Sequence, residues 1–169
     1  MKKISLLLSI SFFLFIFSCE TKTKIIIPNW EPYDETEELA QNATHESTRM
    51  QYKLIQSKFL DKNEIWKNVQ AQIAYFSAED YQALKPLILE QNIPTIQAHI
   101  DAGKLTYEKL TQWYLYRIVK FENDPKKSLH SIIAHKPTAV AQARLCDKNK
   151  STDDHPIFGM PILLKDNIN

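Results

Sequence analysis

Glycine is scarce in this chain. Only Gly103 and Gly159 occur among its 169 residues, where average usage of about 7% would give about a dozen. Two glycines so far apart cannot build the Gly-rich turn that cradles a phosphate group. The sequence therefore excludes the P-loop and the dinucleotide-binding fingerprint.

Cysteine is also scarce, and no metal-binding pattern is present. The two cysteines, Cys19 and Cys146, exclude a disulfide-dense scaffold and a Cys-rich metal site. His130 and His135 are five residues apart, a spacing that does not place both on one helix face. The sequence contains no HExxH, CxxC or GxSxG motif. We expect no cofactor, no metal, and a packing role for Cys146.

Neither sign of charge is in excess. The 21 Lys and Arg residues nearly balance the 20 Asp and Glu residues, for a net charge of +1. A protein that binds nucleic acid through its net charge has a clear basic excess, so we expect no nucleic-acid partner. Hydrophobic residues make up 44% of the chain and charged residues 24%, which is typical of a folded domain.

The first residues have the pattern of an export signal. Two lysines precede an apolar run over residues 4–17, which is shorter than the roughly 20 residues of a membrane-spanning helix and is typical of a signal peptide. Ser18 and Cys19 follow, and residues 16–19 resemble a bacterial lipobox. The resemblance implies that residues 1–18 form a lipoprotein signal peptide and that Cys19 carries a lipid. The alternative is an uncleaved N-terminal anchor.

A lipid on Cys19 would make the membrane a partner of the chain. Two or three acyl chains anchor a protein firmly, because each buried CH₂ contributes about 0.8 kcal/mol. We then expect the mature chain in the bacterial cell envelope, anchored at the outer membrane or the periplasmic face. Glu20 at the second mature position favours the outer membrane, by its similarity to known sorting signals.

Composition and periodicity divide the mature chain. Residues 19–48 are polar and acidic, which predicts a tether, and residues 49–85 predict a helical N-terminal extension. Hydrophobic spacing, a capping box at Ser77 and a cap at Thr106 predict helices over residues 50–74, 77–88, 93–103, 107–123 and 136–146. The apolar stripe of the fourth helix contains Leu110, Trp113, Tyr114, Ile118 and Phe121.

Two short apolar runs, residues 129–134 and 162–164, predict β-strands, the second one buried on both faces. Lys165 follows the second run directly, before Asp166 and Asn167. A lysine held against apolar surroundings loses its proton more readily, and a neutral amine can serve as a general base toward a serine hydroxyl. From spacing alone, a solvated lysine at the end of a strand is the stronger interpretation.

Residues 159–168, with the pattern Gly-x-Pro-x-x-x-Lys-Asp-Asn, resemble the opening motif of the amidase signature family. The helices, strand and Ala-rich segment upstream are similar to that family's N-terminal elements, so the resemblance spans about residues 87–169. It implies an α/β fold in which residues 86–169 form the N-terminal helical layer and first strands of a mixed sheet covered by helices, incomplete in this chain.

The family consists of amide hydrolases and amidotransferases with a Ser–cis-Ser–Lys triad. The resemblance implies that Lys165 is the catalytic base, with a supporting role for Asp166 and Asn167. Neither triad serine has a counterpart in residues 1–169. Ser151 is the only serine after Ser131, and it lies in the loop before the motif. We therefore expect the N-terminal fragment of an exported, lipid-anchored amidase, inactive alone, whose substrate is a small-molecule or peptide amide cut at its C–N bond.

Two alternatives remain. The chain could be a non-catalytic helical lipoprotein, or remnant, that binds a partner. It could also be the A-type component of a glutamyl-tRNA amidotransferase, which the family includes; export disfavours this, because charged tRNA is cytoplasmic. In each case, a helical layer without its sheet is expected to expose apolar surface.

Overall fold

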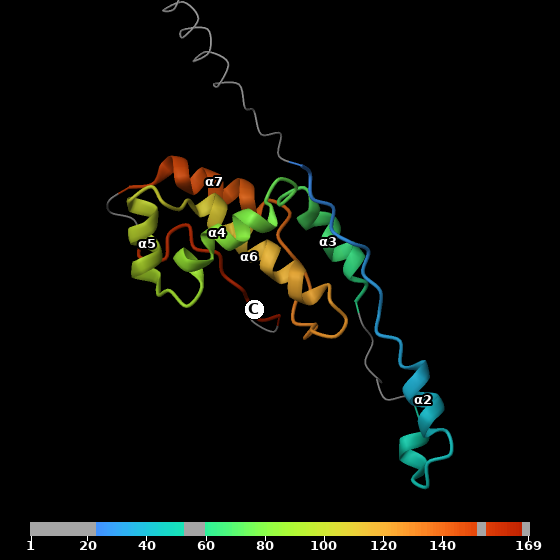
Figure 1. Ribbon diagram of the computed structural model, residues 1–169. Helices are drawn as coiled ribbons and strands as arrows, with labels where there is room; N and C mark the ends of the chain where they lie inside the picture. The colour runs from blue at the N-terminus through green and yellow to red at the C-terminus, as the bar shows by residue number, and fades with distance from the viewer. Residues whose placement is uncertain (1–22, 53–59, 152–154, 167–169) are drawn as a thin grey trace, which may run out of the picture.

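The computed structural model describes residues 23–52, 60–151 and 155–166. In chain order its elements are α2 (Thr36–Asn42), the 3-10 helix η1 (Thr48–Gln51), α3 (Lys62–Gln70), α4 (Ala78–Ile88), α5 (Ile93–Asp101), α6 (Tyr107–Glu122) and α7 (Ala139–Asn149). Figure 1 shows α3 to α7 gathered into one helical body, whereas α2 and η1 project away from it. Regular structure in the described residues is entirely helical.

Four helices of the body start at a side chain that accepts a hydrogen bond from the first helical turn. At the start of α4, Ser77 and Asp80 form a reciprocal capping box, and Thr106 caps α6. Asp61 and Asn92 do the same for α3 and α5. Such a cap contributes about 1 kcal/mol. The predicted caps at Ser77 and Thr106 are confirmed.

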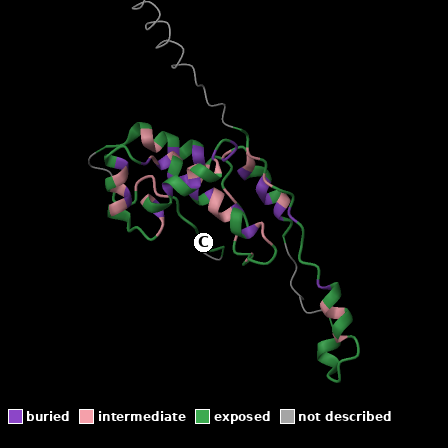
Figure 2. Cartoon of the chain, viewed as in Figure 1, coloured by how far each residue is buried: buried purple, intermediate pink, exposed green. Residues whose placement is uncertain are grey.

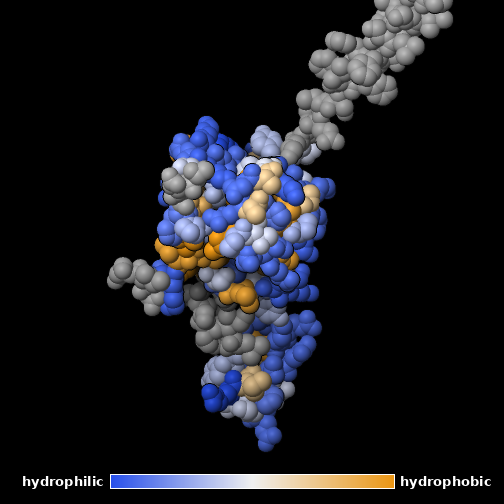
Figure 3. Space-filling view, turned by 90° about the vertical axis from the view of Figure 1, so that its left-hand side faces the viewer, coloured by the Kyte–Doolittle hydropathy of each residue, from blue (hydrophilic) through white to orange (hydrophobic). Residues whose placement is uncertain are grey.

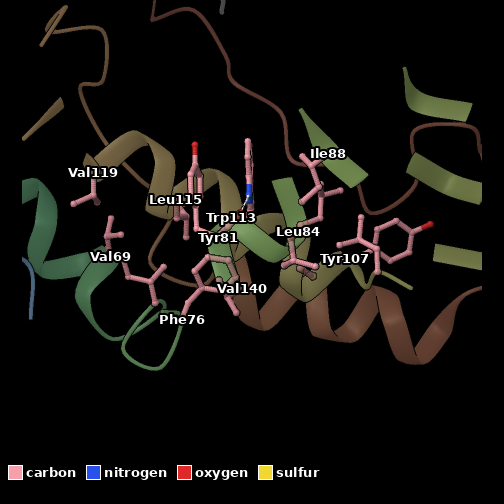
Figure 4. Packing of buried hydrophobic residues seen from close by; sticks show 14 of the residues in the cluster. Val69, Phe76, Tyr81, Leu84, Ile88, Tyr107, Trp113, Leu115, Val119 and Val140 are labelled. Carbon is pink, nitrogen blue, oxygen red and sulfur yellow. Dashed lines mark hydrogen bonds between the residues drawn. The ribbon is translucent and has the colours of Figure 1, made fainter. Parts of the chain in front are cut away.

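α6 lies at the centre of the body, and its residues Leu110 and Trp113 are fully buried. The Trp113 ring stacks on Tyr81 of α4, with ring centroids 5.0 Å apart, and its indole N–H donates to the Tyr81 carbonyl oxygen at 3.0 Å (Figure 4). This contact satisfies the one polar atom of a buried tryptophan and fixes α4 against α6. Figure 2 shows the buried residues on the facing sides of the body's helices, and mostly exposed residues in α2 and η1.

The buried face of α6 is wider than the predicted stripe. Leu110 and Trp113 are buried as expected, but Tyr114 and Phe121 are exposed. Leu115 and Val119, outside the predicted stripe, are buried instead. The reason is that α6 packs against α4 and, most extensively, against α7, so its buried surface is set by two partners rather than by one amphipathic face.

Two predicted helices differ in extent from those observed. Within residues 50–74, the described helix α3 covers only Lys62–Gln70, and residues 53–59 lie outside the described part of the chain. The helix predicted from residue 136 begins at Ala139, after a turn closed by the amide of Ala139 on the carbonyl of Lys136.

α6 and α7 pack side by side, and polar contacts link the C-terminal half of α7 to the start of α6. The carboxylate of Asp147 accepts the backbone N–H groups of Tyr107 at 2.7 Å and Glu108 at 3.0 Å. Arg144 forms two hydrogen bonds with the Glu108 carboxylate, at 2.9 and 2.6 Å, and the Arg144 hydrogen bond lowers the pKa of Glu108. A negative charge at a helix N-terminus is favourable, because it meets unpaired N–H groups and the positive end of the dipole.

Part of the segment predicted as a tether packs on the body. We call residues 25–30 the strap. The strap runs extended beside α3, begins with a hydrogen bond from the amide of Ile25 to the carbonyl of Ala74 at 2.7 Å, and ends at Trp30, which is only 7% exposed and belongs to the core. The short helix α2 follows, so the predicted tether also contains regular structure.

The two predicted strands are not formed in the described residues. Residues 129–134 and 162–164 adopt irregular conformations without a ladder partner, and the mixed sheet is therefore not confirmed. A strand needs a neighbour for its N–H and C=O groups. Most apolar side chains of both runs face solvent, with Leu129 83% exposed and Leu164 82%, whereas Ile132 packs against the core. Figure 3 shows hydrophobic side chains on the surface of the body, as expected for a helical layer without its sheet.

The cap that α7 supplies to α6 predicts the effect of one substitution. Asp147→Ala leaves two helix N–H groups without an acceptor, so we expect the free energy of unfolding to fall by about 1–2 kcal/mol. Urea denaturation at neutral pH measures the change. The matched control is Asp101→Ala, which removes a carboxylate paired with the Lys150 side chain and should have a smaller effect. Equal losses in both variants would contradict the capping role.

Candidate functional site

The predicted lysine motif leaves the body through a turn that packs on the first residue of α6. Two backbone hydrogen bonds close the turn over residues 156–159. The N–H of Phe158 donates to the carbonyl of His155 at 2.7 Å, and the N–H of Met160 donates to the carbonyl of Ile157 at 3.1 Å. The Phe158 ring meets the Tyr107 ring edge to face, with centroids 5.8 Å apart.

Gly159 is required by this packing. Its φ is +70°, and a Cβ placed on it would lie 2.6 Å from the Tyr107 ring. Both the left-handed backbone and the ring contact thus demand a residue without a side chain. Because Asp147 fixes the backbone of Tyr107, α7, α6 and the motif's turn form one connected unit.

Lys165 itself lies on an exposed segment. Ile162, Leu163 and Leu164 before it are 63%, 73% and 82% exposed, and Lys165 and Asp166 are exposed as well. The described residues therefore do not provide the apolar enclosure expected around the Lys165 amine. Asn167 and Cys19 lie outside the described residues, so their predicted roles stay predictions.

A buried polar cluster that none of the predicted motifs indicated joins α3 to α6. Lys62 at the start of α3 and Glu122 at the end of α6 form an ion pair with little solvent contact. The Lys62 ammonium also donates to the Glu122 backbone carbonyl at 2.8 Å and to the Ser128 hydroxyl. The hydroxyls of Ser128 and Ser131 donate to the Glu122 carboxylate at 2.8 and 2.7 Å. The cluster thus joins the extension, the end of α6 and the loop after it.

The electrostatics of this cluster follow from its partners. Burial acts to raise the pKa of Glu122, yet hydrogen bonds from Lys62, Ser131 and Ser128 together lower it to about 2. A lysine at a helix start and a glutamate at a helix end each oppose the helix dipole, and here the two opposed charges meet. Charges of the unfavourable sign at the two helix ends were therefore the feature of the sequence that could have indicated this ion pair.

The cluster holds a lysine and two serines, yet its geometry does not support a proton relay. The three N–H bonds of the Lys62 ammonium are directed at the Glu122 carboxylate, the Glu122 carbonyl and Ser128. All three are engaged as donors, so this arrangement offers no lone pair to a serine hydroxyl. The cluster therefore holds the loop that contains Ser128 and Ser131 in place.

Two further structural facts bear on the function. In residues 23–52, 60–151 and 155–166, no group of three or more His, Cys, Asp or Glu side chains could hold a metal ion. No helix of that same part of the chain has the length and apolar character needed to cross a bilayer.

The chain is similar to amidase-family proteins over part of its length. The A-type component of glutamyl-tRNA(Gln) amidotransferase from Lysinibacillus sphaericus (strain C3-41) is 37% identical over 81 residues, which are 48% of this chain and 16% of that protein. The crystal structure of an amidase family protein from Bacillus anthracis str. Ames matches with a TM-score of 0.60 and 27% identity, over 67% of this chain and 22% of that one. No family model matches the sequence.

These similarities confirm the coarser part of the expectation, a relationship to amidase-family proteins. They also show that the chain spans about one fifth or less of the length of these relatives. The helical body is thus similar to one portion of a larger amidase-family fold.

The fit of Gly159 on Tyr107 predicts a difference between the two glycines. Gly103 and Gly159 both have φ near +70°, but a Cβ on Gly103 meets nothing within 4 Å. We expect Gly103→Ala to lower the free energy of unfolding by about 1–2 kcal/mol, from backbone strain alone. Gly159→Ala should lower it by about 1–3 kcal/mol more, because the added Cβ also clashes with the Tyr107 ring. Urea unfolding followed by tryptophan fluorescence measures the first effect, and hydrogen exchange at the Met160 amide reports the release of the turn. Similar behaviour of the two variants would contradict the packing role of Gly159.

The buried ion pair predicts a dependence of stability on acid. Because the pKa of Glu122 is about 2 in the folded chain and 4.5 is its ordinary value, its contribution is complete above about pH 4.5 and disappears as the pH falls toward 2. Glu122→Gln should lower the free energy of unfolding by about 3 kcal/mol at pH 7, because Lys62 is then buried without a carboxylate partner. Urea titrations at pH 7 and below pH 3 should show the variant and the original chain converging in acid. The exposed Glu64→Gln is the control, and a constant gap at both pH values would refute the assignment.

Proposed function

We propose that this chain supplies the N-terminal part of an exported, lipid-anchored amidase that hydrolyses the C–N bond of a small-molecule or peptide amide. One observation carries the proposal: a Gly-x-Pro-x-x-x-Lys-Asp-Asn motif is seated, through Gly159, on a helical body similar in sequence and structure to amidase-family proteins. The exposed apolar residues before Lys165 support it, because they form a surface that a sheet could cover.

In the proposed mechanism, this chain contributes the base. The Lys165 amine accepts a proton from a bridging serine, which takes the proton of the nucleophilic serine as that serine attacks the amide carbonyl. The C–N bond then breaks, the proton passes to the leaving amine, and water hydrolyses the acyl-enzyme. Both serines would come from the larger part of the amidase fold that this chain does not span.

Formation of the sheet would complete the base. Pairing of residues 162–164 would bury their side chains and exclude water from the adjacent amine. A desolvated amine holds its proton less strongly. Asp166 and Asn167 would support the position of Lys165, and no cofactor or metal is needed for this chemistry.

A second function is favoured by one comparison. The curated relative is the A-type component of a glutamyl-tRNA(Gln) amidotransferase, so a component of such an amidotransferase is the second candidate. The lipobox-like residues 16–19 favour the exported enzyme over it. Globomycin sensitivity of processing at Cys19, with Cys19→Ala as the control, separates the two, because a cytoplasmic amidotransferase would not be processed.

The non-catalytic lipoprotein is the remaining alternative. The discriminating observation is the coding sequence after Asn169. A continuing frame that encodes a Gly- and Ser-rich segment with two candidate triad serines supports the amidase, whereas a stop or a continuation without them refutes it.

The base role predicts the kinetics of two variants of the full-length protein. Lys165→Ala should reduce kcat for amide hydrolysis by about 10⁴-fold or more, as for other members of catalytic units. Lys165→Arg should be almost as impaired, because arginine cannot be deprotonated. Both variants should keep the circular dichroism and melting temperature of the original protein. Lys104→Ala, at another exposed lysine, is the control, and near-normal turnover of either Lys165 variant would exclude Lys165 from the mechanism.

A further inference from the structure

The strap is held by side-chain amides that pair with its backbone. The Gln70 amide donates to the Ile25 carbonyl at 2.5 Å, and the same side chain accepts from the Ile27 N–H at 2.7 Å. Asn63, about two turns earlier on the same face of α3, accepts from the Trp30 N–H at 2.7 Å and donates to the Trp30 carbonyl at 3.0 Å. The two amides thus act on the strap as a neighbouring strand would.

A third amide acts from the end of α6. Asn123 donates to the Pro28 carbonyl at 3.0 Å, and its side-chain oxygen accepts the indole N–H of Trp66 at 2.7 Å. The strap is therefore bound to the extension and to the amidase-like region at once. Its side chains alternate as in a strand: Ile27 packs against the core, whereas Ile26 is 77% exposed.

The contact is not densely packed along its whole length. A groove of about 430 Å³ lies between residues 25–29 and α6, bordered by Ile73, Tyr116 and Val119. The strap is thus held by hydrogen bonds and by Trp30 at one end, rather than by a continuous apolar interface. Hydrogen bonds of this kind contribute only about 0.5–1.5 kcal/mol each, so release of the strap would require several of them to break and Trp30 to leave the core.

The position of the strap sets the reach of the chain from Cys19. Five residues, 20–24, separate Cys19 from Ile25, and even fully extended they allow about 20 Å. With the strap released, the connection would run to Asp61 through residues 20–60, and its greatest possible length exceeds about 100 Å even with α2 and η1 kept helical.

We propose that the strap is a positioning device that holds the helical body next to the membrane surface and, when released, lets the body move outward. The inference rests on the lipid anchor of the proposed function. It changes the expected role of residues 19–48: the docked segment shortens the link between the lipid and the body, and α2 with η1 forms a loop to the side of it rather than a spacer.

The first experiment tests the strap without reference to the membrane. In the purified full chain, hydrogen exchange at the Ile27 and Trp30 amides should be at least tenfold slower than in the variant Asn63→Ala/Gln70→Ala. Asn68→Ala, which changes an exposed amide of the same helix, should leave both rates unchanged. Fast exchange in the original chain would overturn the proposal.

The second experiment measures the height of the body above a bilayer. Neutron reflectometry of the lipid-modified protein on a supported bilayer should place its density within about 20 Å of the surface, and the density of Asn63→Ala/Gln70→Ala should shift outward and broaden. Equal heights would overturn the strap's positioning role while leaving the anchor intact. If Cys19 carries no labelled lipid while exchange at the strap stays slow, the anchor itself fails and the positioning role fails with it. This result differs from equal heights on a lipid-modified protein, so the two failures are distinguished.

Discussion

The two ends of α6 are closed by side chains from elsewhere in the chain, and the arrangement of the body depends on this constraint. At its start, the Asp147 carboxylate accepts two N–H groups. At its end, the Lys62 ammonium binds the Glu122 carbonyl and carboxylate. Unpaired groups at buried helix ends are costly, so α3 and α7 are fixed at opposite ends of the central helix.

This constraint unites regions that differ in their resemblance to amidases. Lys62 lies in the extension, whereas Glu122 lies within the region that resembles the amidase signature family. The strap adds a second connection of the same kind, because Asn63 and Asn123 bind its backbone from the two regions. The extension is therefore part of the same folded body.

The sequence predicted what is local and missed what is distant. The capping box at Ser77 and the cap at Thr106 involve residues within one helical turn, and both were correct. The strand predicted over residues 162–164 was not formed among the described residues, because a strand depends on partners that hydrophobicity cannot supply. At the candidate site, the motif that begins at Gly159 was recognised from local sequence, but the contact between Gly159 and the Tyr107 ring joins residues far apart in the chain. The pairing of Lys62 with Glu122 was missed for the same reason.

The closure of α6 has a consequence for the order in which the chain is made. Lys62 leaves the ribosome before Glu122, so the group that closes the end of α6 is already present when that end emerges. Asp147 is synthesised 40 residues after Tyr107, so the beginning of the helix waits longer for its acceptor. A nascent chain should therefore settle the end of its central helix first and gain the seat for the Gly159 turn only when α7 arrives.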